Sequence, residues 1–193
     1  MKKNSEQTAI TRQNLIDAFC HLLKKKPVQK ITIQSIADKA GYNRGTFYKY
    51  FLDVYDILEH VENLVLAQVK ENFLQNIQPE NFEQTFFEAF TKIQRDKSFY
   101  FDVLFNSDNQ PRFVGKLIAE VSPIFMEKFK LPPENLQSKI LTEIYFRTVI
   151  AAITLWINSG RALSVEDFSK FLRGVLANGV LASMQDNFSE LRI

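Results

Sequence analysis

The segment from Ile31 to Phe51, ITIQSIADKAGYNRGTFYKYF, places the tightest constraint on how this 193-residue chain can fold. Thr32 is of the residue types that cap the start of a helix, and the apolar residues after it recur at helical spacing. Gly41 then supplies a tight turn, and Asn43 is a second cap candidate ahead of a short helix over residues 44–51. The segment therefore predicts two short helices joined by a turn, which is the helix-turn-helix layout.

The second short helix is expected to turn polar side chains outward, because Phe47 and Phe51 are four residues apart and face the core. Such a helix fits the major groove of B-DNA, where its N-terminal residues reach base edges. Arg44 can donate two hydrogen bonds to guanine, Asn43 can pair with adenine, and Thr46 can meet a thymine methyl. The alternative is an ordinary pair of packed helices with a polar outer face. The candidate DNA contacts are Lys30, Thr32, Asn43, Arg44, Gly45, Thr46, Tyr48, Lys49 and Tyr50.

Charge is distributed unevenly along the chain, although the net charge is only +2. Residues 1–50 hold ten Lys and Arg against three Asp and Glu, a net charge of +7, whereas residues 51–193 hold fourteen against nineteen, a net charge of −5. A basic end suits a polyanion such as DNA, and Tyr48 and Lys49 suit its phosphates. The alternative is a merely solvated lysine-rich end, because cations at a helix exit also suit the helix dipole.

Helical periodicity runs through the rest of the chain, and strand signals are weak. The sequence predicts an all-α protein of about nine helices, divided into a three-helix DNA-binding domain over residues 1–52 and a helical regulatory and dimerisation domain over residues 53–193. Pro123 is expected to bend or split its helix, and Ser164 to begin the last one as a cap. Beyond the first three helices, the expected ranges are about 53–76, 81–95, 97–107, 112–129, 134–159 and 164–185.

Catalytic and metal-binding patterns are missing from the sequence. A single cysteine, Cys20, excludes a disulfide framework, lies on an apolar helix face and is expected to be structural. His21 and His60 are far apart, so we expect no metal site, no cofactor and no enzymatic activity. No secretory leader is visible, and the most apolar stretch, Ile144–Ile157, contains Arg147 and is too short to span a bilayer. We therefore expect a soluble, cytoplasmic protein.

The first 60 residues resemble the DNA-binding domain of the TetR family of bacterial transcriptional regulators. The matching elements are Ile36-Ala37 with Ala40-Gly41, Gly45-Thr46-Phe47-Tyr48 with Tyr50-Phe51, and Asp53 with Ile57-Leu58. The resemblance implies a three-helix DNA-binding unit, a larger helical regulatory domain and a homodimer. It also implies repression of transcription that is relieved when a small molecule enters the regulatory domain.

Two positions depart from the family pattern. Members commonly carry histidine where Tyr50 stands, and where Val54 stands they carry a lysine that contacts a phosphate. Losing that lysine shifts more of the DNA contact onto the remaining basic residues. In the C-terminal half, the stretch LWINSGRALSVEDFSKFL from Leu155 to Leu172 resembles the tail of a regulator subgroup that includes the activator of dihydroxyacetone kinase genes.

Residues 73–129 contain eleven of the eighteen phenylalanines. More aromatic rings than helix packing requires can line a roomy apolar cavity, although they can equally fill a helical core. If a cavity exists, we expect a flat, largely apolar ligand. The candidate ligand-binding residues are Phe86, Phe90, Tyr100, Phe105, Arg147 and Trp156.

The last two long helices are expected to form the dimer interface, because the first of them is apolar on more than one face and must bury all of them. Two such helices from each protomer would make a four-helix interface around a twofold axis. The candidate interface residues are Tyr145, Val149, Ala152, Ile153, Phe171, Val175 and Gly179.

The sequence thus predicts a DNA-binding regulator, most simply a repressor, that binds a palindromic operator as a homodimer and is released by a small-molecule effector. The alternative is a co-regulator of the same fold whose effector is another protein. A filled regulatory core with an exposed apolar patch would favour that alternative.

Overall fold

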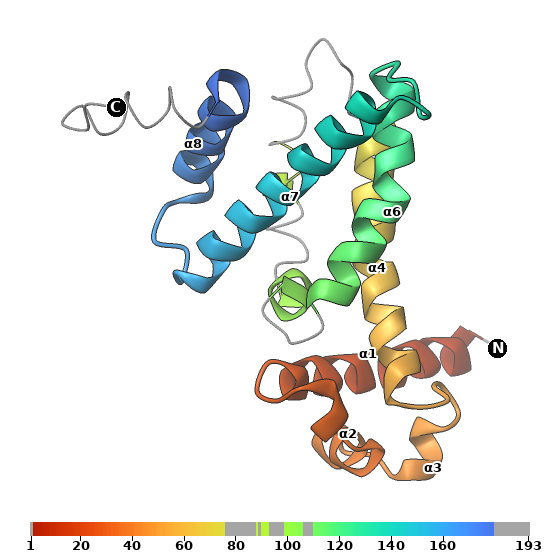
Figure 1. Ribbon diagram of the computed structural model, residues 1–193. Coiled ribbons are helices and arrows are strands. Elements are labelled where there is room, and N and C mark those ends of the chain that lie inside the picture. The colour runs from red at the N-terminus through yellow and green to blue at the C-terminus, as the bar shows by residue number, and fades with distance from the viewer. Residues whose placement is uncertain (1, 76–87, 89, 93–98, 106–109, 180–193) are drawn as a thin grey trace. The chain divides into compact units, whose positions relative to one another are not determined.

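The computed structural model describes residues 2–75, 88, 90–92, 99–105 and 110–179, and every regular element within these ranges is helical (Figure 1). The predicted all-α class is confirmed. The helix expected over 81–95 lies mostly outside the described residues. The elements bounded within these ranges are α1 (Lys2–Leu23), a 3₁₀ turn η1 (Val28–Lys30), α2 (Ile33–Ala40), α3 (Arg44–Phe47), α4 (Val54–Gln75), α6 (Gln110–Lys128), α7 (Leu136–Asn158) and α8 (Val165–Asn178).

The chain forms two compact units, and each unit is built from two separate segments of the sequence. The N-terminal unit comprises Met1–Gln68 and a returning segment, Lys97–Phe113; the C-terminal unit comprises Val69–Asp96 and Val114–Ile193. Helices α4 and α6 therefore each contribute residues to both units. The predicted domain boundary after residue 52 stays a prediction.

Side-chain caps fix the helix starts of the N-terminal unit. Thr32 Oγ1 accepts a hydrogen bond from Ser35 N at 3.1 Å, and Ser35 Oγ accepts one from Thr32 N at 3.1 Å, so the two residues form a capping box. Asn43 Oδ1 accepts from Thr46 N at 2.8 Å, and Asp53 Oδ1 accepts from the backbone at the start of α4. The caps at Thr32 and Asn43 are where the sequence predicts them.

Gly41 ends α2 in the left-handed conformation, with φ of 76°. Tyr42 N then donates to Ala37 O at 2.9 Å, the six-to-one bond that closes a helix end of this type. The turn between α2 and α3 therefore has the glycine-dependent geometry that the sequence predicts. Only glycine adopts this φ without strain.

The core of the N-terminal unit is built from α1, α2, α3 and the first part of α4. Phe19, Ile36 and Phe47 are wholly buried, as are Leu58 and Cys20. Burial raises the pKa of the Cys20 thiol, which leaves it protonated and unreactive. The structural role expected of this cysteine is confirmed by its place in the core.

The returning segment attaches to this core by polar and aromatic contacts. Tyr100 Oη donates to Asp17 Oδ1 on α1 at 2.8 Å and also contacts Gln13 Nε2. Arg112 Nη2 lies 3.4 Å from Oε2 of Glu62, a carboxylate on α4 that is wholly buried. A charge buried in this way needs a partner of opposite sign, so the contact ties the start of α6 to α4.

The C-terminal unit is organised around α7, which packs one side against α6 and α8. Trp156 stacks on Phe168 of α8 with ring centroids 4.9 Å apart, and Phe90 lies 5.8 Å from Trp156. Ser164 caps α8 by accepting from Asp167 N at 3.0 Å, as predicted. Gly179 is its C-cap, so α8 ends before the expected residue 185.

Pro123 lies inside α6 without splitting it, since α6 is one helix from Gln110 to Lys128. Of the two outcomes expected of this proline, a split helix is excluded. Proline has no N–H, so the carbonyl of Ala119, four residues earlier, loses its helical donor.

Candidate nucleic-acid interface and regulatory core

Helix α3 is a single turn fixed by one buried ring. Phe47 is wholly buried and packs edge-on to Tyr48 at 5.9 Å and against Phe51 at 5.7 Å, with Phe51 also buried. The inward orientation predicted for Phe47 and Phe51 is confirmed. Residues 48–50 continue as a turn rather than as helix, so α3 is shorter than the predicted 44–51. The ring of Phe47 thus anchors a helix whose other side chains are free to face outward.

The outward side of α3 carries the expected DNA-contact residues. Arg44 and Lys49 are exposed, and Tyr48 retains 52% of its accessible surface. Arg44 Nη2 lies 3.4 Å from Tyr48 Oη, one helical turn away. The tyrosine hydroxyl therefore restricts where the guanidinium can point. Thr46 and Tyr50 are half-buried.

Asn43 has a structural task that limits how it can read a base. Its Oδ1 accepts from Thr46 N and also from Thr46 Oγ1, at 2.8 and 3.2 Å. Pairing with adenine uses both the oxygen and the nitrogen of the amide. The expected adenine contact would therefore compete with the cap, whereas the amide nitrogen alone remains free to donate.

Gly45 lies close to this same cap. A Cβ at position 45 would lie 3.2 Å from Asn43 Oδ1, closer than ordinary van der Waals contact. Any larger side chain would thus push on the capping amide.

Two further candidates, Lys30 and Thr32, flank the start of α2. Lys30 closes η1 and is exposed, so its ammonium can reach a phosphate. The hydroxyl of Thr32 is engaged in the capping box, which leaves less of it for DNA. At the next helix, Val54 is the first residue of α4 and is half-buried behind the Asp53 cap.

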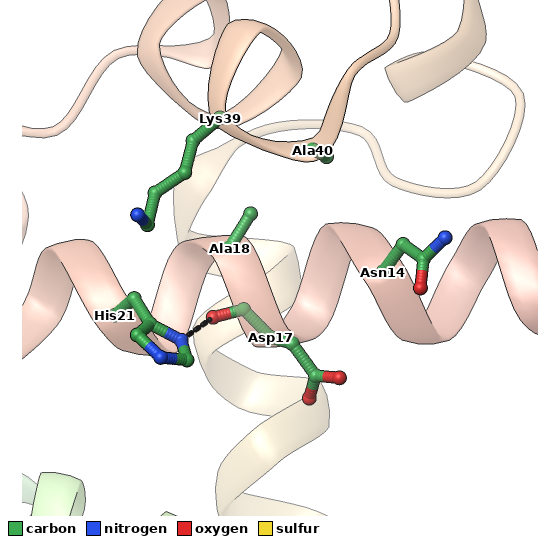
Figure 2. A pocket seen from close by; sticks show the side chains of 6 residues that line it. All are labelled: Asn14, Asp17, Ala18, His21, Lys39 and Ala40. Atoms are coloured by element: carbon green, nitrogen blue, oxygen red, sulfur yellow. Dashed lines mark hydrogen bonds between the residues drawn. The ribbon is translucent and has the colours of Figure 1, made fainter.

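A small cleft between α1 and α2 lies apart from these contacts (Figure 2). It encloses about 260 Å³ and includes Asp17, His21 and Lys39, with none of the nine candidate DNA contacts. His21 Nδ1 is 2.8 Å from Asp17 O, so the ring is held against its own helix. Phe99 of the returning segment packs on that ring at 4.8 Å.

His60 on α4 is the other histidine, and it pairs with a cation. Its Nδ1 lies 3.1 Å from Arg12 Nη2. Burial and the charge of Arg12 lower the pKa of His60, against an opposing effect of Asp56. Over the part of the chain that the structure describes, no three His, Cys, Asp or Glu residues group as metal ligands.

The six candidate ligand residues do not gather in one place within either unit. Phe90 and Trp156 are buried together in the C-terminal unit. Tyr100 and Phe105 belong to the N-terminal unit, where Phe105 stacks on Phe101 at 4.3 Å. Arg147 is largely exposed and pairs with Glu143 along α7, and Phe86 lies outside the described residues.

The seven candidate interface residues divide between the core and the surface. Val149 and Ile153 are 4% and 5% exposed and pack inside the C-terminal unit, so they are not available to a partner. Tyr145 stacks on Phe125 at 5.2 Å and is half-buried. Ala152 and Val175 are half-buried, whereas Phe171 and the α8 C-cap Gly179 are exposed.

Sequence reasoning missed the returning segment. It assigned Tyr100 to a regulatory cavity, whereas the hydroxyl pairs with Asp17 and burial with that carboxylate raises the pKa of Tyr100. It gave no role to Glu62 or Arg112. The only signal in the sequence was an acidic residue within the apolar face of α4, where a charge needs a partner.

The helix-turn-helix with its exposed basic recognition turn, joined to a larger helical unit, defines a DNA-binding transcriptional regulator. Residues 15–61 match the family described as bacterial regulatory proteins, tetR family, and residues 80–178 match the family described as a transcriptional regulator C-terminal region. The chain belongs to the TetR family of transcriptional regulators. Its N-terminal domain is the DNA-binding domain of that family.

A curated relative and several solved structures are similar to this chain. The uncharacterized HTH-type transcriptional regulator YxbF of Bacillus subtilis (strain 168) is 28% identical over 165 residues, which are 80% of this chain and 41% of YxbF. The chain thus spans about two-fifths of the length of that relative.

The solved structures share the fold at low sequence identity. The fatty acid degradation regulator FadR from Bacillus halodurans has a TM-score of 0.65 at 15% identity, covering 88% of this chain and 96% of FadR. A TetR-family regulator from Bordetella parapertussis 12822 has a TM-score of 0.63 at 16% identity, with coverages of 89% and 96%. The dihydroxyacetone kinase operon activator DhaS has a TM-score of 0.57 at 15% identity, with coverages of 90% and 98%.

Proposed function

We propose that the protein is a cytoplasmic repressor that binds a palindromic operator as a homodimer and is released by a small, largely apolar ligand. The observation that carries this proposal is the exposed turn of Arg44 to Lys49, held on the buried ring of Phe47. A single turn reaches few base pairs. Two copies related by a twofold axis would read two half-sites and supply the affinity that one copy lacks.

The dimer is proposed from the side of α7 that the C-terminal unit leaves exposed. Four large apolar residues on this side retain from about half to three-quarters of their surface, and on α8 Phe171 is 45% exposed. In this proposal they take the place of Val149 and Ile153 as interface residues, because removing exposed apolar surface from water favours association. The exposed residues of α7 are Ile140, Leu141, Ile144 and Leu155.

Helix α7 could bury this side in a bilayer instead. Among the described helices it is the one with the length and apolar composition to cross a membrane, and 39% of its most apolar window is buried. One feature favours a protein partner. The ion pair between Arg147 and Glu143, at 2.5 Å, lies in the middle of the helix, and charges are costly at the centre of a bilayer.

The proposed effector would act on the aromatic cluster of the C-terminal unit. Phe90, Trp156 and Phe168 form a buried apolar cluster, and Trp156 Nε1 donates to Leu163 O at 2.9 Å. FadR and DhaS, which share the fold, are named for fatty acid degradation and for a dihydroxyacetone kinase operon. Since these names differ, the fold does not select a ligand.

A second candidate is a co-regulator whose effector is another protein. Its support is that the three rings of the cluster are all 5% exposed or less and contact one another, as in a filled core, while α7 presents an apolar surface. A small molecule would then have to displace side chains before it could bind.

Selection of bound fragments from random double-stranded DNA tests the proposal. We expect an enriched sequence made of two inverted half-sites about one helical turn apart, centre to centre. Enrichment of a single, asymmetric site, or binding that does not depend on sequence, would contradict the dimeric operator complex. Arg44→Ala serves as the variant that should lose the enrichment.

A further inference from the structure

The outer side of α6 carries a groove to which no expected site residue contributes. Its volume is about 610 Å³, within the range of roughly 300–1,000 Å³ that is typical of small-molecule sites. All of its lining belongs to the C-terminal unit. Two adjacent stripes of the helix form its floor, and we call it the α6 groove: Ile118, Ser122 and Met126 on one stripe, and Ala119, Pro123 and Glu127 on the other.

The loop after α6 closes one end of the α6 groove in a fixed conformation. Leu131 N donates to Met126 O at 2.9 Å, and Lys130 adopts a φ of 52°. This six-to-one bond folds the chain back over the last turn of the helix, a motif in which the residues at the positions of Leu131 and Met126 are frequently apolar partners. Leu131 and Pro133 both line the groove, so an apolar wall is already formed without a ligand.

A proline interrupts the hydrogen-bond pattern of the helix in the floor of the groove. Pro123 has no N–H, so the carbonyl of Ala119 receives no helical hydrogen bond from it. Ala119 and Pro123 are both exposed and both line the groove. A ligand with an N–H donor would therefore replace the donor that proline cannot supply to this carbonyl.

The charge in the groove is negative. Glu127 is exposed and lines the groove, and no ion pair joins it to a Lys or Arg of the described residues. The other polar side chain, Ser122, carries no charge. An anionic ligand would meet repulsion here, and an uncharged hydrocarbon would displace water from the carbonyl and the carboxylate without supplying a donor in its place.

We propose that the α6 groove binds a compact hydrophobic ammonium compound. Its hydrocarbon part fills the space between Ile118, Met126 and Leu131, and its ammonium donates to Glu127 and to the Ala119 carbonyl. A charge-assisted hydrogen bond beside an apolar wall gives both affinity and discrimination by charge. This inference goes beyond the proposed function, because it concerns binding at a site separate from the aromatic cluster and does not require that binding releases DNA.

The test is calorimetric titration of the full chain, free of DNA, with three probes that share one ring. They are 1-naphthylmethylammonium, 1-naphthylmethanol and 1-naphthylacetate, which carry a positive, a neutral and a negative group. We expect the ammonium to bind at least about fivefold more tightly than the alcohol, which is what a partly exposed charge pair contributes, and the acetate to bind weakest.

Three variants locate that binding. Ala119→Leu places a larger side chain on the floor at an exposed position and should abolish binding of both the ammonium and the alcohol. Glu127→Gln should lower the affinity for the ammonium about fivefold and leave the alcohol unchanged. Glu166→Gln, an exposed acid on α8, is the matched control and should change neither.

Equal affinity of the parent and Glu127→Gln for the ammonium, or binding that survives Ala119→Leu, would overturn the assignment. So would the absence of ammonium binding at millimolar concentration. If sedimentation showed that Ala119→Leu changes the oligomeric state, the groove would be a contact between copies and not a ligand site. Operator binding is measured separately, so its failure would overturn the proposed function without touching this result.

Discussion

Helix α3 exposes mainly polar side chains to solvent, whereas helix α7 exposes large apolar ones, and each helix is held in place in a different way. The short α3 has one wholly buried ring, Phe47, and otherwise exposes polar side chains, while side chains at 43 and 53 cap the helices around it. The long α7 exposes Ile144 and Leu155 at 57% and 72%. The contrast matches the two roles proposed for these helices: a locally capped frame for contact with a polyanion, and an incompletely buried helix for association.

The largest effect should come from removing the anchor of α3. Phe47→Ala removes a wholly buried ring and leaves a cavity, so we expect it to lower the free energy of unfolding by about 3–5 kcal/mol. Chemical unfolding measures this change. Tyr48→Ala, at the next residue but half exposed, is the matched control and should change stability by only about 0.5 kcal/mol. Similar losses of stability in Phe47→Ala and Tyr48→Ala would contradict the assignment of Phe47 as the residue that anchors α3.

The second effect concerns the exposed side of α7. Ile144→Lys combined with Leu155→Lys places four charges in a symmetric interface, and we expect the dimer dissociation constant to rise at least about 100-fold. Light scattering at micromolar concentration should then give the mass of a monomer.

Leu74→Lys makes the same chemical change at a residue of α4 that is 56% exposed and lies outside the proposed interface. It should leave the mass unchanged. A parent protein that is already monomeric would contradict both the interface and the palindromic operator.

The third effect distinguishes a residue that contacts bases from a residue that contacts only phosphates. Arg44→Ala should cost about 1–3 kcal/mol of operator binding and relax the base preference at one position, if the guanidinium contacts a guanine. Lys49→Ala should weaken binding to all sequences alike, because phosphates carry no sequence information. Titration against a panel of operator variants distinguishes the two. Unchanged selectivity in Arg44→Ala would place Arg44 among the phosphate contacts.

A fourth, smaller effect uses the departure from the family at the start of α4. Val54→Lys should add one phosphate contact per protomer, so the slope of log K against log salt should steepen by up to about 2 in the dimer. The increase in binding affinity should be nearly equal on operator and random DNA. Because Val54 is half-buried, lysine there can instead cost stability, and thermal melts run alongside reveal it. An unchanged slope in a variant that melts like the parent would exclude this placement.

The smallest expected effect is a pH dependence from His60. Its pKa is lowered in the folded protein, chiefly by burial, so the unfolded chain takes up the proton first as the pH falls. Stability from the neutral ring is therefore complete above about pH 6.5 and declines as the pH falls toward the folded pKa. The free energy of unfolding of the His60→Gln variant, measured as a function of pH, should lack this part of the pH dependence. Identical pH profiles for parent and variant would contradict the assignment.

The N-terminal frame was predictable because its determinants are local. Thr32, Asn43 and Asp53 each cap a helix that begins at the next residue, and Gly41 ends one at a φ of 76°. Phe47 and Phe51 face inward because their spacing is one helical turn. Such signals depend only on neighbours within about four residues, so a sequence reveals them without knowledge of the rest of the fold.

The remaining contacts were not predictable, because they join residues far apart in the chain. The bond from Tyr100 to Asp17 spans 83 positions, and nothing near either residue specifies the other. In α7, apolar residues occupy more than one face, so their pattern predicts burial but not which residues face inward. Val149 was therefore expected at an interface, whereas it is 4% exposed inside the C-terminal unit and Ile144 is 57% exposed.

The returning segment also has a consequence for synthesis on the ribosome. Residues 99–105 and Phe113 complete the packing of the N-terminal unit, and Phe101, Leu104 and Phe113 are at most 4% exposed. Helices α1 to α3 leave the exit tunnel well before these rings are made. Since domains generally fold as units during translation, the N-terminal unit cannot close until its last member, Phe113, has emerged. A nascent chain stalled before that point would expose a core that chaperones recognise.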